Sequence, residues 1–109
     1  MRDLVEYLKE VNTGKDVFYD DRGFATYQIN GEECYIMDIY VKPEHREGRV
    51  ASYYADEIAK IAKENNCTYL TGSVVPSARN STKSLKVLLG YGFELSYSVE
   101  NFIAFKKEL

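Results

Sequence analysis

Hydrophobic and polar residues follow two periods along the chain, one typical of helices and the other of strands. Apolar residues recur at helical spacing from Asp3 to Val11, after the loop that ends near Val50, and in a short segment after Asn80. Runs rich in β-branched and aromatic residues predict strands over 17–19, 24–29, 33–41, 67–75, 93–97 and 101–105. The order of these elements is α-β-β-β-α-β-α-β-β.

This order predicts an α+β fold with a mixed, mostly antiparallel sheet. The turns at 20–23 and 30–31 are short, so the first three strands should form an antiparallel meander. The strand at 67–75 follows a strand and a helix, which predicts a right-handed crossover and a parallel partner at 33–41. The last two strands should form a hairpin, so one parallel pair lies at the centre of the sheet.

Composition mainly excludes other classes of protein. With 109 residues, 45% of them hydrophobic, we expect one domain over 1–109. The net charge is -3 and the 14 basic residues are scattered, so we expect no nucleic-acid partner. No apolar run reaches the ~18 residues of a membrane span, and we expect no membrane partner and a cytoplasmic location. Cys34 and Cys67 lack metal-site spacing and are interpreted as reduced core thiols, with no metal bound.

The most informative stretch is 36–51, Ile-Met-Asp-Ile-Tyr-Val-Lys-Pro-Glu-His-Arg-Glu-Gly-Arg-Val-Ala. An apolar strand stops at Pro43, a loop with two arginines and a glycine follows, and a helix begins at once. The first backbone N–H groups of a helix have no partner inside it. Such a loop and helix start is therefore a place to hold phosphate.

This stretch, the amphipathic helix behind it and the Gly-Phe pair at 92–93 resemble a GCN5-related N-acetyltransferase (GNAT) over most of the chain. Family members carry Gln or Arg, two variable residues, Gly, one variable residue, and Gly or Ala; these positions fall on Arg46, Arg49 and Ala51. Arg49 stands where glycine is usual, and we expect Gly48 to take over the sharp turn. The resemblance implies helices on both faces of the sheet.

The resemblance also implies acetyl-CoA as co-substrate. The residues implied to hold its phosphates are Arg46, Glu47, Gly48, Arg49, Val50 and Ala51. The strand that ends at Val41 would splay away from the strand at 67–75. The pantetheine arm would then pair like an added strand with the exposed backbone of Ile39, Tyr40 and Val41, where an N–H would polarise the thioester carbonyl. Members have an Asn that touches the pantetheine where this chain has Asn80 or Ser81, and a helix N-cap explains these two equally well.

Transfer of an acetyl group to an amine needs a base for the amine and an acid for the departing thiolate. In polyamine acetyltransferases, which this strand resembles, a Glu thought to act as base stands where this chain has Met37, and the acid tyrosine of the family falls on Leu88. Our candidate catalytic residues are Asp38, acting through a water, and Tyr91. Alternatively, Asp38 accepts a hydrogen bond from a neighbouring loop, and Tyr91 packs beside Phe93.

Three interpretations of the function remain open from the sequence. The first is an acetyl-CoA-dependent N-acyltransferase that moves an acetyl group directly to an amine acceptor. Members of the family usually begin with a strand and two helices, whereas this chain offers one helix, so we expect an acceptor side that suits a protein or another bulky amine, or a wall donated by another subunit in a homodimer. The second is a non-catalytic CoA-binding or protein-interaction module, favoured by Met37 and Leu88. A domain whose loop binds nothing is a third reading.

Overall fold

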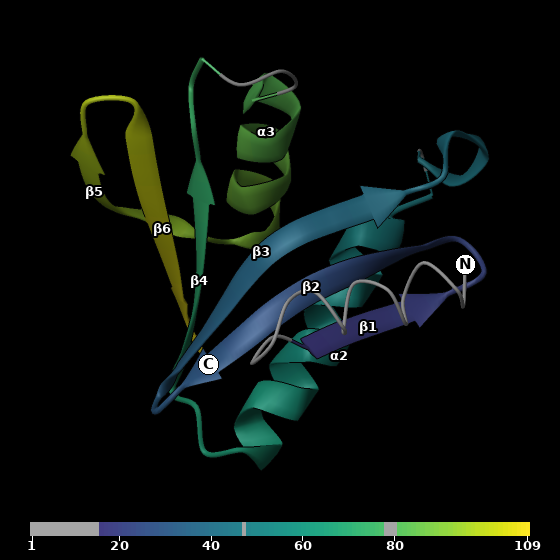
Figure 1. The fold of residues 1–109 in the computed structure, drawn as a ribbon, viewed down its shortest axis with the longest axis horizontal. Helices are drawn as coiled ribbons and strands as arrows, with labels where there is room; N and C mark the ends of the chain where they lie inside the picture. Colours follow the sequence, from purple (N-terminus) through teal and green to yellow (C-terminus); the bar gives the residue numbers. More distant parts are fainter. Residues whose placement is uncertain (1–15, 47, 78–80) are drawn as a thin grey trace.

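The computed structural model of the chain describes residues 16–46, 48–77 and 81–109 (Figure 1). In this part of the chain a sheet with the strand order β1-β2-β3-β4-β6-β5 packs with the α-helices α2 and α3. The elements are β1 (Asp16–Asp20), β2 (Gly23–Asn30), β3 (Glu33–Val41), the 3-10 turn η1 (Pro43–His45), α2 (Val50–Glu64), β4 (Tyr69–Val74), α3 (Ser81–Tyr91), β5 (Glu94–Val99) and β6 (Phe102–Glu108).

The mixed, mostly antiparallel sheet expected from the sequence is confirmed. β1, β2 and β3 form the antiparallel meander, β3 and β4 are parallel, and β6 pairs antiparallel with both β4 and β5. The short turns at 21–22 and 31–32 account for the meander, and α2 supplies the crossover that a parallel pair requires. The helix predicted over 3–11 lies outside the described residues.

The parallel pair is joined at one end only. Residues 33–35 of β3 pair with residues 69–71 of β4, and the rest of the two strands diverges, as Figure 1 shows. Shortly after the last pair, β3 carries a β-bulge: Ile36 lies opposite Tyr27 and Asp38 lies opposite Thr26, so Met37 is the extra residue. A bulge leaves its extra residue outside the regular ladder and bends the strand. This end of β3 therefore has backbone groups without a partner in β4.

The core lies between the sheet and the two described helices, on one face that we call the helix face. Leu70 and Val74 of β4 belong to the same buried cluster as Tyr54 of α2, and Leu85 and Leu88 of α3 pack against this cluster. The packing side of α2 is the one that its apolar spacing predicts. Of the helices expected on both faces, the structure thus describes those on one face, and we call the other side the opposite face.

The two cysteines lie in this core. Both Cys34 and Cys67 are buried and carry free thiols, as expected. Burial raises the pKa of the Cys34 thiol to about 12, and a thiol that stays protonated is a poor nucleophile and metal ligand. Both residues belong to the buried core cluster, where they contribute to packing.

Candidate functional site

The site expected from the sequence lies where β3 ends and α2 begins. The chain turns through η1 and enters α2 at Val50, and no described side chain caps the first turn of this helix. The first α-helical hydrogen bond at this end runs from the amide of Tyr53 to the carbonyl of Arg49, 3.1 Å away. The preceding amides of the first turn have no intrahelical acceptor. Together with the positive end of the helix dipole, they can bind an anion such as phosphate.

Arg46 lies across the end of β3. Its Nε donates a hydrogen bond of 2.8 Å to the carbonyl oxygen of Val41. Its guanidinium carbon lies 5.8 Å from the centre of the Tyr40 ring. These two contacts hold the planar guanidinium against the end of β3. Its other N–H groups remain for a bidentate contact with phosphate oxygens.

Arg49 is the residue of this loop in the left-handed conformation. Its φ is 61° and its ψ is 25°, and a side chain is strained there because the Cβ approaches the following carbonyl. Gly48 does not have a left-handed φ, and a Cβ on it would meet only ordinary contacts, the closest 3.6 Å from the His45 carbonyl oxygen. The expectation that Gly48 takes over the turn is therefore wrong. The strained turn remains at Arg49, which is the position where the family usually has glycine.

The other cofactor candidates fall into two groups. Ile39, Tyr40 and Val41 form the end of β3 beyond its pairing with β4, next to the loop. Val50 and Ala51 open α2. The structure therefore brings the strand end, Arg46 and the helix start together. Glu47 and Asn80 lie outside the described residues, and Ser81 is the first residue of α3.

Asp38, the candidate base, is exposed on the opposite face of the sheet. It accepts a hydrogen bond of 3.0 Å from Oγ1 of Thr26, a buried residue on β2. One alternative expected Asp38 to accept a hydrogen bond from a neighbouring loop. The bond is present, but its donor lies on the neighbouring strand β2. This bond uses one carboxylate oxygen and orients the side chain beside the bulge at Met37.

Tyr91, the candidate acid, connects the two helices. Its hydroxyl donates a 2.6 Å hydrogen bond to Oδ1 of Asp56 on α2, and its ring packs 6.0 Å from that of Phe93. Burial and the bond to Asp56 raise the pKa of this hydroxyl. Tyr91 belongs to the helix side of the sheet, whereas Asp38 lies on the opposite face, so the structure does not bring the two candidates together.

A groove lies beside Tyr91, between α2 and the end of β6. Its volume is about 570 Å³, and its lining mixes acidic and basic side chains with the two tyrosines Tyr53 and Tyr91. The lysines and carboxylates of this lining largely balance. The groove therefore lacks the positive character of a phosphate site, in contrast to the loop at Arg46 and Arg49.

The sequence resemblance placed the acid tyrosine of the family at Leu88. The Cδ2 of Leu88 lies 3.0 Å from where a Cβ on Gly72 of β4 would stand, and the Phe93 ring is the next side chain there. The side chain of Leu88 thus reaches β4 as an apolar packing residue. It offers no proton at this point.

Sequence reasoning missed a pair of hydroxyl groups that joins the diverging strands. Tyr35 of β3 and Ser73 of β4 share a hydrogen bond of 2.7 Å between their hydroxyl oxygens. Next to it, Oγ1 of Thr71 donates to Glu33 Oε2 at 2.8 Å. Strand alternation could have assigned each hydroxyl to the non-core face. The pairing itself joins residues far apart in sequence and depends on the register of the parallel strands.

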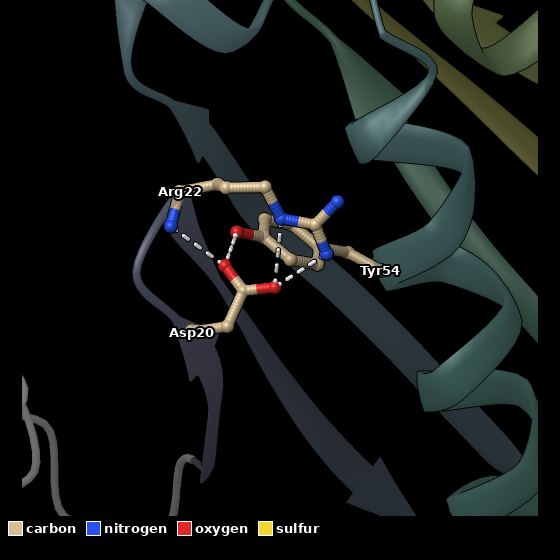
Figure 2. A network of polar contacts seen from close by, with 3 residues as sticks. All are labelled: Asp20, Arg22 and Tyr54. Atoms are coloured by element: carbon tan, nitrogen blue, oxygen red, sulfur yellow. Dashed lines mark hydrogen bonds and ion pairs between the residues drawn. The ribbon is translucent and has the colours of Figure 1, made fainter.

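The turn between β1 and β2 is bonded to the segments on either side of the loop, and Figure 2 shows its contacts with Tyr54. Asp20 accepts a 2.6 Å hydrogen bond from the hydroxyl of Tyr54 on α2, and it forms a 2.6 Å ion pair with Arg22. The carbonyl of Arg22 accepts a 2.7 Å bond from the amide of Lys42, just after β3. Although partial burial by itself raises the pKa of Asp20, the hydrogen bonds from Arg22 and Tyr54 lower it to about 2. One turn thus fixes both the end of β3 and the start of α2.

Two other kinds of site are not seen in the part of the chain that the structure describes. Among those residues, no group of His, Cys, Asp and Glu side chains is arranged to hold a metal ion. No described helix is both long enough and apolar enough to cross a membrane.

Comparison with known proteins identifies the same family that the sequence resembles. A family model described as the acetyltransferase (GNAT) family matches residues 17–91. No curated protein matches the chain significantly. Among solved structures, a GNAT-family protein from Desulfovibrio desulfuricans superposes with a TM-score of 0.78 at 13% identity, over 98% of this chain and 75% of that one.

Two further structures were solved with coenzyme A. The PaiA N-acetyltransferase from Thermoplasma acidophilum has a TM-score of 0.76 at 17% identity, over 97% of this chain and 68% of that one. An acetyltransferase from Bacillus subtilis has a TM-score of 0.71 at 14% identity, over 99% of this chain and 84% of that one. At these identities the superpositions establish a shared fold.

Proposed function

Because the chain belongs to the GNAT acetyltransferase family, we propose that it is an N-acyltransferase that uses acetyl-CoA and moves the acetyl group directly to an amine. One observation carries this proposal. The end of β3 that has no partner in β4 leads through η1 and a short loop to the uncapped start of α2, and the Arg46 guanidinium is held against this strand end. A long ligand with an amide-containing arm and phosphate groups matches this combination.

The loop would hold the phosphate end of the coenzyme. The free amides at the start of α2, including those of Val50 and Ala51, supply hydrogen bonds to phosphate oxygens. Arg46 and Arg49 add positive charge on either side of Gly48, and Glu47 completes the proposed loop. Arg46 is already held by the Val41 carbonyl and the Tyr40 ring, so less side-chain entropy is lost on binding.

The strand would hold the pantetheine and acetyl end. Backbone groups at Ile39 and Tyr40 have no partner in β4 and can pair with the amides of the pantetheine arm as an added strand would. An N–H on this stretch can polarise the thioester carbonyl and stabilise the oxyanion that forms when an amine attacks. Asn80 and Ser81 would contact the pantetheine from the start of α3.

Asp38 and Tyr91 remain our first proposals for base and acid. Asp38 is exposed beside the bulge, where a water between its carboxylate and an incoming amine has access. Tyr91 would have to exchange its bond to Asp56 for one to the coenzyme sulfur. Positioning and oxyanion stabilisation supply a large share of the rate in such a transfer.

We propose a protein or another bulky amine as the acceptor. Across the hairpin of β5 and β6, Tyr97 pairs with Ala104 and Val99 pairs with Phe102. Paired residues share a face of the sheet, which here is the opposite face, and both Tyr97 and Val99 are exposed. Tyr40 is also exposed. Exposed aromatic and aliphatic side chains of this kind suit a contact with a macromolecule or with a second copy in a homodimer.

A second candidate function is a CoA-binding or protein-interaction module without catalysis. Leu88 packs where the family has its acid, and the Tyr91 hydroxyl is engaged by Asp56. Both observations favour a site that holds the coenzyme without turning it over.

Calorimetry with acetyl-CoA and measurement of coenzyme A release separate these functions. Acetyl-CoA at ~100 times its dissociation constant should add about 2.7 kcal/mol of stability and raise the melting temperature by several degrees. Release of coenzyme A should then depend on an amine, in a panel of peptides, small amines and polyamines. Binding without release would favour the module, and no binding at millimolar acetyl-CoA would contradict both functions that involve the coenzyme.

A further inference from the structure

We propose that the hydroxyl groups of Tyr35 and Ser73 form the proton relay of the acetyl transfer. This proposal rests on the proposed function, because it assigns a further role within the same site. It identifies groups that neither the sequence motifs nor the family match assigns. The relay is an alternative to Asp38 and Tyr91 as the route for the two protons. It gives a chain with Met37 and Leu88 at the usual base and acid positions a way to perform the transfer.

The first observation is where the pair lies. The last backbone pair between β3 and β4 joins Tyr35 to Thr71. Beyond it the strands diverge, and the 2.7 Å bond between Tyr35 and Ser73 crosses between them. The hydroxyl groups thus lie just beyond the last backbone pair, where the two strands diverge and where we propose that the coenzyme arm lies.

The second observation is that the hydroxyl pair lies at the same position along the strands as the bulge in β3. Ser73 is two residues beyond the last pair on β4, and Met37 is two residues beyond it on β3. Met37 is the extra residue of the bulge, so its backbone groups lie outside the regular ladder with β2. The hydroxyl pair and the irregular backbone, which can stabilise an oxyanion, therefore lie at the same position along the diverging strands.

The third observation is the face of the sheet. Tyr35 stands between Cys34 and Ile36, which are buried on the helix face, so its side chain points to the opposite face. Ser73 precedes Val74, which is also buried on the helix face, and points the same way. An acceptor that approaches from the opposite face meets these hydroxyls first, while α2 and α3 cover the helix face.

The relay balances the protons of the reaction. The amine nitrogen attacks the thioester carbonyl carbon, a C–N bond forms and the C–S bond breaks. The nitrogen gives one proton to the nearer hydroxyl oxygen, which passes its own proton across the hydrogen bond to the other hydroxyl. The second hydroxyl gives its proton to the leaving sulfur. Both hydroxyls end neutral, and the products are the amide and the free thiol of coenzyme A.

The neighbouring bond provides a matched control. Thr71 and Glu33 also join β3 and β4 on the opposite face, at 2.8 Å, but in the part where the two strands are still paired. Thr71→Val removes a cross-strand bond of similar length without touching the relay. If Tyr35 and Ser73 have a purely structural role, removing either of their hydroxyl groups should have the same effect as removing the hydroxyl group of Thr71.

The test compares Tyr35→Phe, Ser73→Ala, their double variant and Thr71→Val. We expect each relay variant to lose about 10²-fold in kcat, with the dissociation constant of acetyl-CoA by calorimetry unchanged. Groups that act as a unit are not additive, so the double variant should lose no more than either single one. Ser73→Thr, which keeps a hydroxyl, should restore most of kcat, and Thr71→Val should stay near the original rate.

The proposal fails if Tyr35→Phe and Ser73→Ala keep kcat within about threefold, since a general acid–base group contributes more. It also fails if Thr71→Val loses as much as they do. Melting temperatures of all variants, measured alongside, ensure that the folded enzyme is compared. If the original chain releases no coenzyme A, the proposed function is contradicted instead. The calorimetric binding measurement distinguishes this result from failure of the relay.

Discussion

At the scale of single residues, the loop between β3 and α2 departs from its family at one strained position. Arg49 keeps the left-handed conformation of the usual glycine, with φ 61°. A side chain in this region costs about 1–2 kcal/mol, whereas glycine adopts it without a steric penalty. The chain therefore gives up some stability and gains a positive charge next to the start of α2.

Arg49→Gly should stabilise the fold, because it removes this strain. Part of the gain is offset by the greater freedom of glycine in the unfolded chain, so we expect a net increase of about 0.5–1 kcal/mol in the free energy of unfolding. Urea denaturation followed by circular dichroism measures it. Gly48→Ala is the control: Gly48 has no left-handed φ and its Cβ would have room, so it should not show a strain penalty. A loss of stability in Arg49→Gly would contradict this account.

The Asp20 carboxylate should make the fold sensitive to acid. Its pKa is about 2 in the folded chain, below the ~3.9 of an unperturbed aspartate. Its stabilising contribution is therefore complete above about pH 4 and is lost as the pH falls toward 2. After discounting for solvent screening of this partly exposed group, we expect Asp20→Asn to cost about 1–2 kcal/mol at pH 6.

The difference between the original chain and Asp20→Asn should shrink steadily between pH 4 and pH 2. Urea denaturation at several pH values follows this change. Asp21→Asn alters the exposed neighbouring residue of the same turn and should leave the pH dependence as it is. A difference for Asp20→Asn that stays constant from pH 6 to pH 2 would show that the carboxylate charge is not what stabilises the turn.

At the scale of the elements, periodicity was sufficient for the sheet and insufficient for its details. Alternation and helical spacing predicted the strands and the packing side of α2, because each depends on which residues must be buried. The divergence of β3 from β4 was implied by the family resemblance alone, whereas the bulge at Met37 and the residue at which the β3–β4 pairing ends depend on register between distant segments. The bond between Tyr35 and Ser73 follows from that register, so no local pattern could reveal it.

The candidate site was likewise predicted in part from the sequence and in part not. The motif in 46–51 identified the loop, because its chemistry is local to a helix start. It did not reveal that Arg49 keeps the left-handed turn, since a side chain there breaks a local preference. Nor did it indicate that the Tyr91 hydroxyl binds Asp56, which requires the packing of α3 against α2.

Gly23 connects the meander to the end of β3, and replacing it tests how firmly that end is held. A Cβ on Gly23 would lie 2.0 Å from the carbonyl oxygen of Tyr40, a backbone atom that cannot rotate away. Gly23→Ala should therefore displace the end of β3 and destabilise the fold by about 1–3 kcal/mol. It should also weaken acetyl-CoA binding, because the displaced segment is the one proposed to hold the acetyl end.

Gly90→Ala is the matched control for this prediction. A Cβ on Gly90 meets nothing within 4 Å, and the residue lies inside α3, where alanine is favoured over glycine by about 1 kcal/mol. Thermal denaturation and calorimetry on both variants would show opposite signs for stability and a binding defect in one only. Equal stability of Gly23→Ala and the original chain would contradict the close contact.

At the scale of the whole molecule, the chain offers two regions where a ligand could lie. One is the junction of β3, the loop and α2. The other is the groove of about 570 Å³ between α2 and the end of β6, lined by residues that include Tyr53, Tyr91 and Lys107. Charge separates them, because the groove lining balances lysines against carboxylates, whereas the junction combines two arginines with free helix amides. An anionic coenzyme should therefore choose the junction.

Hydrogen–deuterium exchange with and without acetyl-CoA tests this choice across the whole chain. We expect slower exchange in peptides that contain residues 36–41 and 50–52, because their free amides gain acceptors from the coenzyme. Peptides of β5 and of the groove end of β6 should exchange as before, since they lie outside the junction. Arg46→Ala should reduce the protection of both junction segments at a fixed acetyl-CoA concentration. Protection concentrated around Tyr53, Tyr91 and Lys107 would instead place the ligand in the groove and contradict the proposed site.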